Sequence, residues 1–372
     1  MKRILVTAGA VYAPLDGNKI VSNRAQGVWA VLFADYLADL GHEVVLVVPD
    51  LTKGLHSRKN QEVIKHSGFW DYYKICQIVA PRVDAAVMAA AVTNWIPRDP
   101  FPGKMPTDRE EMSIPFILTP HVIDEMRKLN PQMTLIGCKL GVDFTLEQLE
   151  TAAYKVIEGA RCHAVIMNDR QDLKRKMVLH PDGAILSFDD NFKGLYTYLR
   201  SLIEAQHYQT VRRDADFFHE GQVYWEGLFD KIIERNRPLF SKVIGGKPRF
   251  FGSLMTRMAQ PDHFLASPRE KGAEFSSKDA VIVVKVDHEK REVHTCRGKA
   301  TLNAPLLHRV LQEHPDASAV LHLHQQIPGA YVSHYVMPGT AGDTMRDPLP
   351  PTFNIVGHGF VQALNADGYP LR

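Results

Sequence analysis

The sequence predicts an α/β protein of two domains: a doubly wound, Rossmann-like parallel-sheet domain, followed by a smaller α+β domain. Three observations support this prediction. Short apolar runs alternate with helical patterns over residues 1–206, which is typical of a parallel sheet. The strict alternation is lost after residue 246. The length of 372 residues is enough for about two domains.

The first domain is expected to begin with a buried strand at Arg3–Ala8. Apolar residues at helical spacing from about Ala25 to Leu40 then predict a helix, which leads to a second strand at His42–Val48. The later strands are expected at Asp84–Ala89, Leu135–Gly137, His163–Met167 and Ala184–Ser187, and the later helices at 120–129, Phe144–Ala160 and Asn191–Gln206. Thr145 is expected to cap the second of these helices.

Residues 207–245 are rich in charged and aromatic side chains and are expected to form a linker with an amphipathic helix. The second domain is expected over residues 246–372, with the junction near Gly245 and Gly246. Its predicted elements are strands at Arg249–Met255, His263–Ala266, Val281–Val286, Ala319–His324, Phe353–Val356 and Phe360–Leu364, and a helix at Ala304–Glu313.

Composition narrows the classes of partner and compartment. The net charge of +2 does not favour nucleic acid or an anionic membrane as a partner. No apolar run approaches roughly 20 residues, so no membrane span is expected. The four cysteines form no CxxC pair and the N-terminal apolar run is too short for a signal peptide, so we expect a cytoplasmic protein.

The pattern His322-Leu323-His324 is the sharpest chemical signal in the sequence. Residues i and i+2 of a strand face the same side, so both imidazoles can reach one metal ion. His358, between two glycines, is the best candidate for a third ligand, and three neutral imidazoles are a common zinc shell. The alternative is an unrelated pair of histidines, because the chain contains 17 of them.

A longer pattern surrounds these histidines: Gly252–Arg257, Ala300–His308, Pro315–His324 and His358–Gly359. In its order and spacing it resembles the class II aldolase/adducin family. The resemblance implies an aldolase-like α+β domain and a zinc ion, or another divalent metal, on His322, His324 and His358. The family's catalytic glutamate falls on Asn303, whose amide cannot carry a proton. Glu313, His308 and Tyr331 are the candidates for the missing proton carrier.

The N-terminal half contains Gly9 directly after its first strand, where an open parallel sheet binds ligands, but it has neither GxGxxG nor a P-loop motif. A longer set of motifs lies at Thr7–Val11, Ala13–Asp16, Lys19–Asn23, Met88–Trp95, Gly103–Met105, Gly137–Val142 and Met167–Asp169. These motifs resemble the phosphopantothenate–cysteine ligase family, which is the DNA/pantothenate metabolism flavoprotein C-terminal domain family.

This resemblance implies ligation of a small-molecule carboxylate to an amine through an acyl-nucleotide, with CTP or ATP and Mg²⁺. Asn23 would stabilise the activated carbonyl and Lys104 would supply a cation. The residues implied to bind the nucleotide are Gly9, Ala90, Asn94, Lys104, Gly137 and Lys139. Alternatively, Asn23 caps the helix that begins near Ala25, and Lys104 is an ordinary loop lysine.

Together these patterns predict a ligase fused to a metal-dependent aldolase-like domain. Two alternatives stay open: a metal-dependent lyase, decarboxylase or epimerase with a degenerate nucleotide domain, and a non-catalytic, adducin-like module. Both resemblances imply a homo-oligomer.

Overall fold

The structure, a computed structural model, describes residues 1–108, 110–189, 192–213, 222–244, 246–296 and 298–371. Two compact units account for the chain: the first comprises Met1–Pro181 and Ser187–Glu204, and the second Asp182–Leu186 and Ala205–Arg372. Two features of the sequence prediction, the helix start at Asn191 and the junction glycine Gly245, lie outside the described residues.

The first unit is built on an eight-stranded sheet with the order β14-β13-β12-β11-β7-β1-β5-β6. Six neighbouring strands are parallel. They are β6 (Gln61–His66), β5 (Glu43–Pro49), β1 (Arg3–Thr7), β7 (Ala85–Met88), β11 (Thr134–Gly141) and β12 (Ala164–Asp169). β13 (Lys176–Leu179) runs antiparallel to β12, and β14 (Ile185–Phe188) follows it. The strand order reverses between β1 and β7, so the predicted doubly wound sheet is confirmed.

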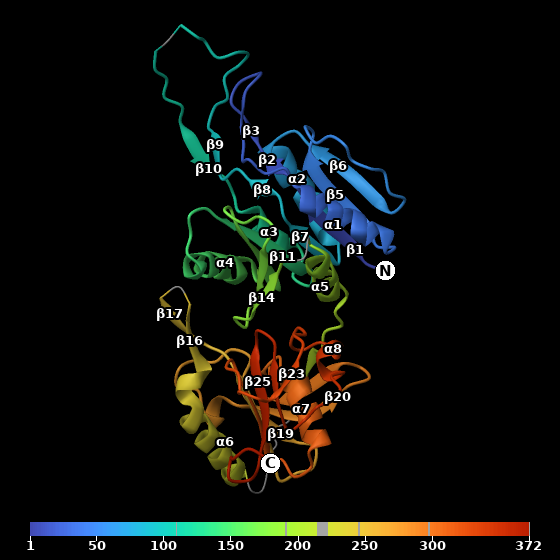
Figure 1. The fold of residues 1–372 in the computed structure, drawn as a ribbon, viewed down its shortest axis with the longest axis vertical. Coiled ribbons are helices and arrows are strands. Elements are labelled where there is room, and N and C mark those ends of the chain that lie inside the picture. The colour runs from blue at the N-terminus through green and yellow to red at the C-terminus, as the bar shows by residue number, and fades with distance from the viewer. Residues whose placement is uncertain (109, 190–191, 214–221, 245, 297, 372) are drawn as a thin grey trace. The chain divides into compact units, whose positions relative to one another are not determined.

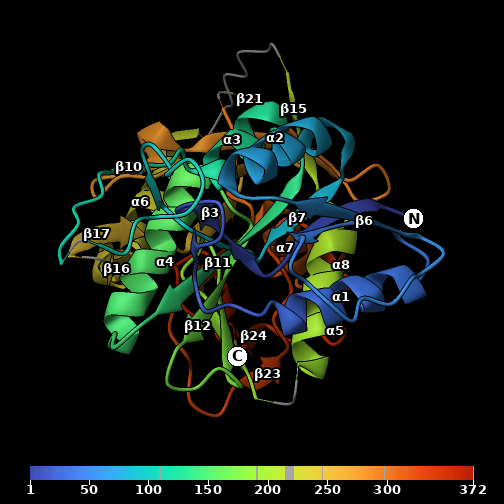
Figure 2. The same ribbon diagram turned by 90° about the horizontal axis from the view of Figure 1, so that it is seen from above.

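Five α-helices cover the two faces of this sheet (Figures 1 and 2). α1 (Val28–Asp39) and α5 (Lys193–Glu204) lie side by side on one face. The other face carries α2 (Phe69–Val79), α3 (Val122–Leu129) and α4 (Leu146–Ala160), with the short 3-10 helix η1 (Ala80–Arg82) after α2. The predicted cap of α4 is confirmed: the Thr145 hydroxyl accepts the Gln148 N–H, and the Gln148 side chain accepts the Thr145 N–H.

The sequence prediction missed β6 and α2. β6 is an edge strand whose polar residues show no apolar run, and α2 is rich in aromatic residues rather than in the usual helix formers. Three small strand pairs also complete the loops at the carboxyl edge: β2 (Ala10–Val11) with β8 (Ala91–Val92), β3 (Ala13–Pro14) with β4 (Ile20–Val21), and β9 (Trp95–Pro97) with β10 (Phe116–Leu118).

The second unit contains a nine-stranded mixed sheet with the order β15-β21-β20-β19-β18-β22-β25-β24-β23. The strands are β15 (Gln209–Arg212), β18 (Ser253–Arg257), β19 (Phe264–Ala266), β20 (Val281–Asp287), β21 (Glu292–Cys296), β22 (Ala319–Leu323), β23 (Tyr331–Ser333), β24 (Thr352–Ile355) and β25 (Gly359–Leu364). A separate hairpin pairs β16 (Ser241–Ile244) with β17 (Lys247–Phe250). The predicted strand Arg249–Met255 is therefore wrong as one element, because the chain turns at Gly252 with φ 79°.

The helices of the second unit are α6 (Gln222–Asn236), α7 (Ala304–Glu313) and α8 (Ala341–Thr344), with 3-10 turns η2 (Arg237–Phe240) and η3 (Ser277–Asp279) (Figure 1). The apolar side of α6 packs Phe229 and Ile232 against the sheet residues Leu254 and Leu321 in one buried cluster. The predicted α+β architecture is confirmed, including the bounds of α7. In the described part of the chain, every helix is too short or too polar to cross a membrane.

Candidate functional sites

The carboxyl ends of β1 and β7 lie side by side at the strand-order reversal, which is where open α/β sheets bind ligands. The chain is tied together at this point by backbone hydrogen bonds. The Gly9 carbonyl accepts the Ala91 N–H at 2.8 Å, and the Thr7 hydroxyl accepts the Ala90 N–H at 3.2 Å. The structure therefore brings Gly9 and Ala90, which were predicted from separate motifs, onto neighbouring loops.

Asn23 joins the same group of loops. Its side-chain Nδ2 donates to the Ala91 carbonyl at 3.0 Å and lies 3.5 Å from the Thr93 hydroxyl. The alternative that Asn23 caps α1 is wrong, because the N-cap residue is Gly27, in the left-handed region with φ 74°. A Cβ at Gly27 would overlap the backbone of Gly9. The N-terminus of α1, with its unpaired N–H groups, thus lies against Gly9, as in an anion-binding site.

Lys104 lies on a different loop. The Asp16 carboxylate accepts the Met105 N–H at 2.9 Å, and the Gly17 N–H donates to the Gly103 carbonyl at 2.6 Å. The hydrogen bond from Met105, followed by that from Asn18, lowers the pKa of Asp16. Asp16 thereby fixes the backbone around Lys104. The Lys104 side chain itself is exposed and, among the described residues, makes no polar contact with Gly9, Asn23 or Ala90.

The remaining predicted nucleotide residues have the following surroundings. Gly137 lies in β11, where a Cβ would come within 3.1 Å of Ile123 and 3.2 Å of Val156, so it permits close packing against α3 and α4. The Lys139 carbonyl, near the carboxyl end of β11, accepts Nδ2 of Asn168 at 3.3 Å. Asn94 is exposed. Nucleotide binding by Gly137, Lys139 and Asn94 stays a prediction.

In the second unit, the three predicted metal-binding histidines lie together. The ring centroids are 4.9 Å apart for His322 and His324, 4.4 Å for His322 and His358, and 4.7 Å for His324 and His358. One nitrogen from each ring lies within 4.8 Å of the others. His322 is in β22 at the centre of the sheet, His324 follows the end of this strand, and His358 lies in the turn between β24 and β25.

A glycine makes this arrangement possible. Gly359 has φ 127°, and a Cβ there would overlap the carbonyl oxygen of Leu323. The start of β25 therefore approaches the end of β22 more closely than any other residue type allows. This close approach places His358 beside the two histidines of β22.

The electrostatic surroundings favour neutral imidazoles. His322 is 0% exposed and His358 2% exposed. Burial lowers the pKa of His322 well below its usual value, and burial followed by the neighbouring His358 lowers the pKa of His324 to about 3. Nε2 of His322 and both ring nitrogens of His358 are buried without a hydrogen-bond partner in the described structure. Buried nitrogens without partners are costly, and a metal ion would satisfy them.

Asn303 contacts the histidine cluster directly. Its Nδ2 donates to the Ser253 hydroxyl at 3.0 Å and lies 3.4 Å from Nδ1 of His322, while its Oδ1 is buried without a partner. With the amide rotated by half a turn, Oδ1 would accept an Nδ1–H from His322 and leave Nε2 for a metal ion. The catalytic role of Asn303 stays a prediction, but its position makes it a residue that orients His322.

Two residues near the histidines were missed by the sequence prediction. The Asp182 carboxylate lies 2.9 Å from Nε2 of His358. Lys271 is largely buried, which lowers its pKa to about 8, and its charge contributes to the low pKa values of His322 and His324. Neither residue belongs to a motif, and both are far from the histidines in sequence, so no signal in the sequence points to them.

The three candidates for the missing proton carrier lie elsewhere in the second unit. Glu313 forms an ion pair with Arg309, and Nδ1 of His308 lies 3.0 Å from Nε2 of His288. Tyr331 is exposed on β23. The structure thus places none of the three beside the histidine cluster.

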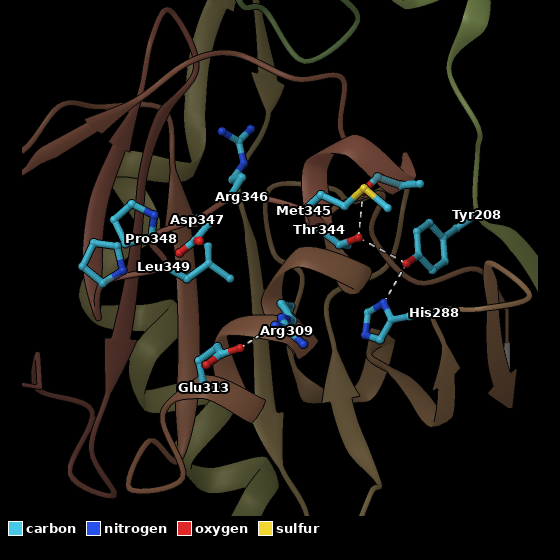
Figure 3. Close-up of a pocket in the computed structure, with 12 residues that line it drawn as sticks. Tyr208, His288, Arg309, Glu313, Thr344, Met345, Arg346, Asp347, Pro348 and Leu349 are labelled. Carbon is cyan, nitrogen blue, oxygen red and sulfur yellow. Dashed lines mark hydrogen bonds and ion pairs between the residues drawn. The ribbon is translucent and has the colours of Figure 1, made fainter.

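Glu313 instead lines a separate pocket of about 790 Å³ (Figure 3). In this pocket the Tyr208 hydroxyl lies 2.6 Å from Nδ1 of His288 and 3.3 Å from the Thr344 hydroxyl. Since His288 also contacts His308, a chain of hydrogen bonds leads from the pocket to the buried His308 ring. The pocket is large enough for a small molecule.

Comparison with known proteins identifies the first unit. Residues 1–193 match the family described as DNA/pantothenate metabolism flavoprotein C-terminal domain, and the chain belongs to this family. It is 28% identical over 171 residues to the coenzyme A biosynthesis bifunctional protein CoaBC of Thermococcus kodakarensis, which covers 45% of this chain and 41% of that relative. The chain thus spans less than half of the length of this curated relative.

Two solved structures complete the comparison. The DNA/pantothenate metabolism flavoprotein from Streptococcus pneumoniae has a TM-score of 0.51 and 19% identity, and the match covers 55% of this chain and 99% of that one. This similarity shows a shared fold. L-fuculose 1-phosphate aldolase from Glaciozyma antarctica PI12 has a TM-score of 0.28 and 15% identity, with coverage of 41% and 69%.

Proposed function

We propose that the chain is a bifunctional enzyme of small-molecule biosynthesis, in which a CTP- or ATP-dependent carboxylate–amine ligase is fused to a zinc-dependent, aldolase-like domain. The ligase proposal rests on membership of the flavoprotein C-terminal domain family. It is supported by the position of Gly9, Asn23 and Ala90 at the reversal point of the sheet.

In the proposed ligase reaction, a carboxylate oxygen attacks the α-phosphorus of the nucleotide, and pyrophosphate leaves. The amine then attacks the acyl carbon and gives up a proton, and CMP or AMP leaves. The N-terminus of α1 against Gly9 would hold phosphate oxygens. Asn23 would donate an amide N–H to the oxygen on which negative charge develops. Mg²⁺ would accompany the triphosphate.

For the second unit, the observation that carries the proposal is the convergence of three buried imidazoles whose nitrogens lack hydrogen-bond partners. His322, His324 and His358 would hold a divalent ion, with His322 oriented by Asn303. A bound divalent ion would polarise a substrate carbonyl as a Lewis acid. Lys271, with a pKa of about 8, would be able to give or take a proton near neutral pH.

The ligase proposal is tested by incubating the full chain with Mg²⁺, CTP or ATP, and a panel of carboxylates and amines. Release of pyrophosphate with equimolar CMP or AMP, dependent on both organic substrates and reduced by Asn23→Ala, is the expected result. If no combination releases pyrophosphate, the ligase proposal is wrong. Activity that is lost in His322→Ala but kept in Asn23→Ala and Lys104→Ala would favour a metal-dependent lyase, decarboxylase or epimerase instead.

A further inference from the structure

The proposed metal site lacks a negative charge among its three histidines. A divalent ion held only by neutral imidazoles would keep its full charge inside a buried site, which is costly. Asn303, at the position of the aldolase-type glutamate, is uncharged and contacts Nδ1 of His322. A carboxylate from another part of the chain would compensate this charge.

Asp182 lies in the right place to supply it. It belongs to the Asp182–Leu186 segment, which is part of the second unit. Its Oδ2 is 2.9 Å from Nε2 of His358, and the side chains are 22% and 1% exposed, respectively. Its charge also acts on the other two histidines, since it partly opposes the fall in pKa of His322 and His324.

The contact between Asp182 and His358 lacks the geometry of a hydrogen bond. Although the two atoms are 2.9 Å apart, Nε2 of His358 has no hydrogen-bond partner in the described structure. Ligand atoms about 2.0–2.2 Å from a shared ion lie about 2.9–3.5 Å apart, depending on the coordination angle. The separation of Oδ2 and Nε2 is therefore that of two neighbouring ligands of one ion.

The surrounding residues hold Asp182 in this position. The Tyr335 hydroxyl donates to Oδ2 of Asp182 at 3.2 Å, and the Tyr335 ring lies edge-on to His358 at 5.4 Å. Gly357, with φ 67°, lets the turn before His358 approach the Ile185 carbonyl, which would lie 2.9 Å from a Cβ at this position. A hydrogen bond to a carboxylate ligand from an outer residue is common in metal sites.

We propose that Asp182 is the fourth protein ligand of the metal ion, which completes a three-histidine, one-carboxylate site. This inference rests on the proposed metal-binding function of the histidine cluster. It assigns the carboxylate to a segment outside the aldolase-like motifs. Tyr335 acts as a positioning residue that directs Oδ2 toward the ion.

Cobalt(II) substitution of the full chain tests the proposal, because a ligating thiolate produces a near-ultraviolet charge-transfer band that carboxylate and imidazole ligands do not. Asp182→Cys is expected to gain this band when Co²⁺ is added. The matched control Asp367→Cys, at an exposed aspartate of the same unit, is expected not to gain it. Asp182→Asn is expected to lower the affinity for Zn²⁺ and Co²⁺ by on the order of 100-fold.

The outcomes separate this inference from the proposed function. If Asp182→Cys binds Co²⁺ but gains no charge-transfer band, Asp182 is not a ligand, while the histidine site stands. An unchanged Zn²⁺ affinity in Asp182→Asn would overturn the inference in the same way. If the wild-type chain binds neither ion, or His322→Ala binds both as well as wild type does, the proposed metal function is wrong together with the inference.

Discussion

The two candidate sites differ in how the chain builds them. The histidine cluster is set by regular strands at the centre of a sheet, and its side chains converge in a buried space. The nucleotide region is set by loops at the edge of a sheet, where backbone contacts converge and the side chains of Lys104 and Asn94 are exposed. The first site is therefore preorganised in its side chains, and the second only in its backbone. We expect mutations to affect the two sites accordingly.

The largest expected effect is that of His322→Ala. Removing the central imidazole leaves two histidines, so the affinity for Zn²⁺ should fall by more than about 100-fold, beyond the loss typical of outer-shell residues. Calorimetry or competition with a chromophoric chelator measures this change. His334→Ala, at an exposed histidine of the same unit, should bind as wild type does. Equal losses in both variants would contradict the preorganised cluster.

The next effect concerns Gly359. A methyl group there would overlap the Leu323 carbonyl, so Gly359→Ala should lower the free energy of unfolding by about 4 kcal/mol or more and weaken metal binding. Gly329→Ala is the matched control, because Gly329 also has positive φ, at 77°, but has nothing within 4 Å of the added Cβ. Urea denaturation followed by circular dichroism compares the two. Similar losses would mean that backbone strain, rather than the close approach of β25 to β22, limits the site.

A parallel pair tests the nucleotide region. Gly27→Ala would push α1 away from Gly9, so it should destabilise the first unit by about 2–4 kcal/mol and reduce nucleotide binding. Gly41→Ala, at φ 89° with open space around the added Cβ, should cost about 1 kcal/mol and leave nucleotide binding unchanged. Unfolding in urea and calorimetry with CTP and ATP provide the two measurements. Intact nucleotide binding in Gly27→Ala would argue against a site at the N-terminus of α1.

The smallest effect on stability is expected for Asn23→Ala. The loss of the hydrogen bond to the Ala91 carbonyl should cost only about 0.5–1.5 kcal/mol. Its effect on the rate of acyl transfer should be larger, about 100-fold, if the amide stabilises developing charge. Asn18→Ala, an exposed asparagine nearby, serves as the control for both measurements. Equal losses of stability and rate would indicate a purely structural role for Asn23.

The sequence predicted the histidine site well because strand periodicity fixes the direction of His322, and His324 follows the same strand. Its carboxylate was beyond prediction, because Asp182 approaches His358 only through tertiary structure. The doubly wound sheet was also predictable from its apolar strands. The interpretation of Asn23 as a cap failed because α1 begins later, with a left-handed glycine whose reason is contact with Gly9.

The Asp182–Leu186 segment gives the chain an interleaved path. The backbone passes from one unit to the other after Pro181, returns after Leu186 and crosses again after Glu204. No single cut therefore yields two complete units. A fragment that begins at Ala205 keeps every histidine of the cluster but omits Asp182, and a fragment that ends at Glu204 carries that aspartate without the histidines. The two parts of this fusion are consequently not exchangeable cassettes, because each is encoded partly inside the limits of the other.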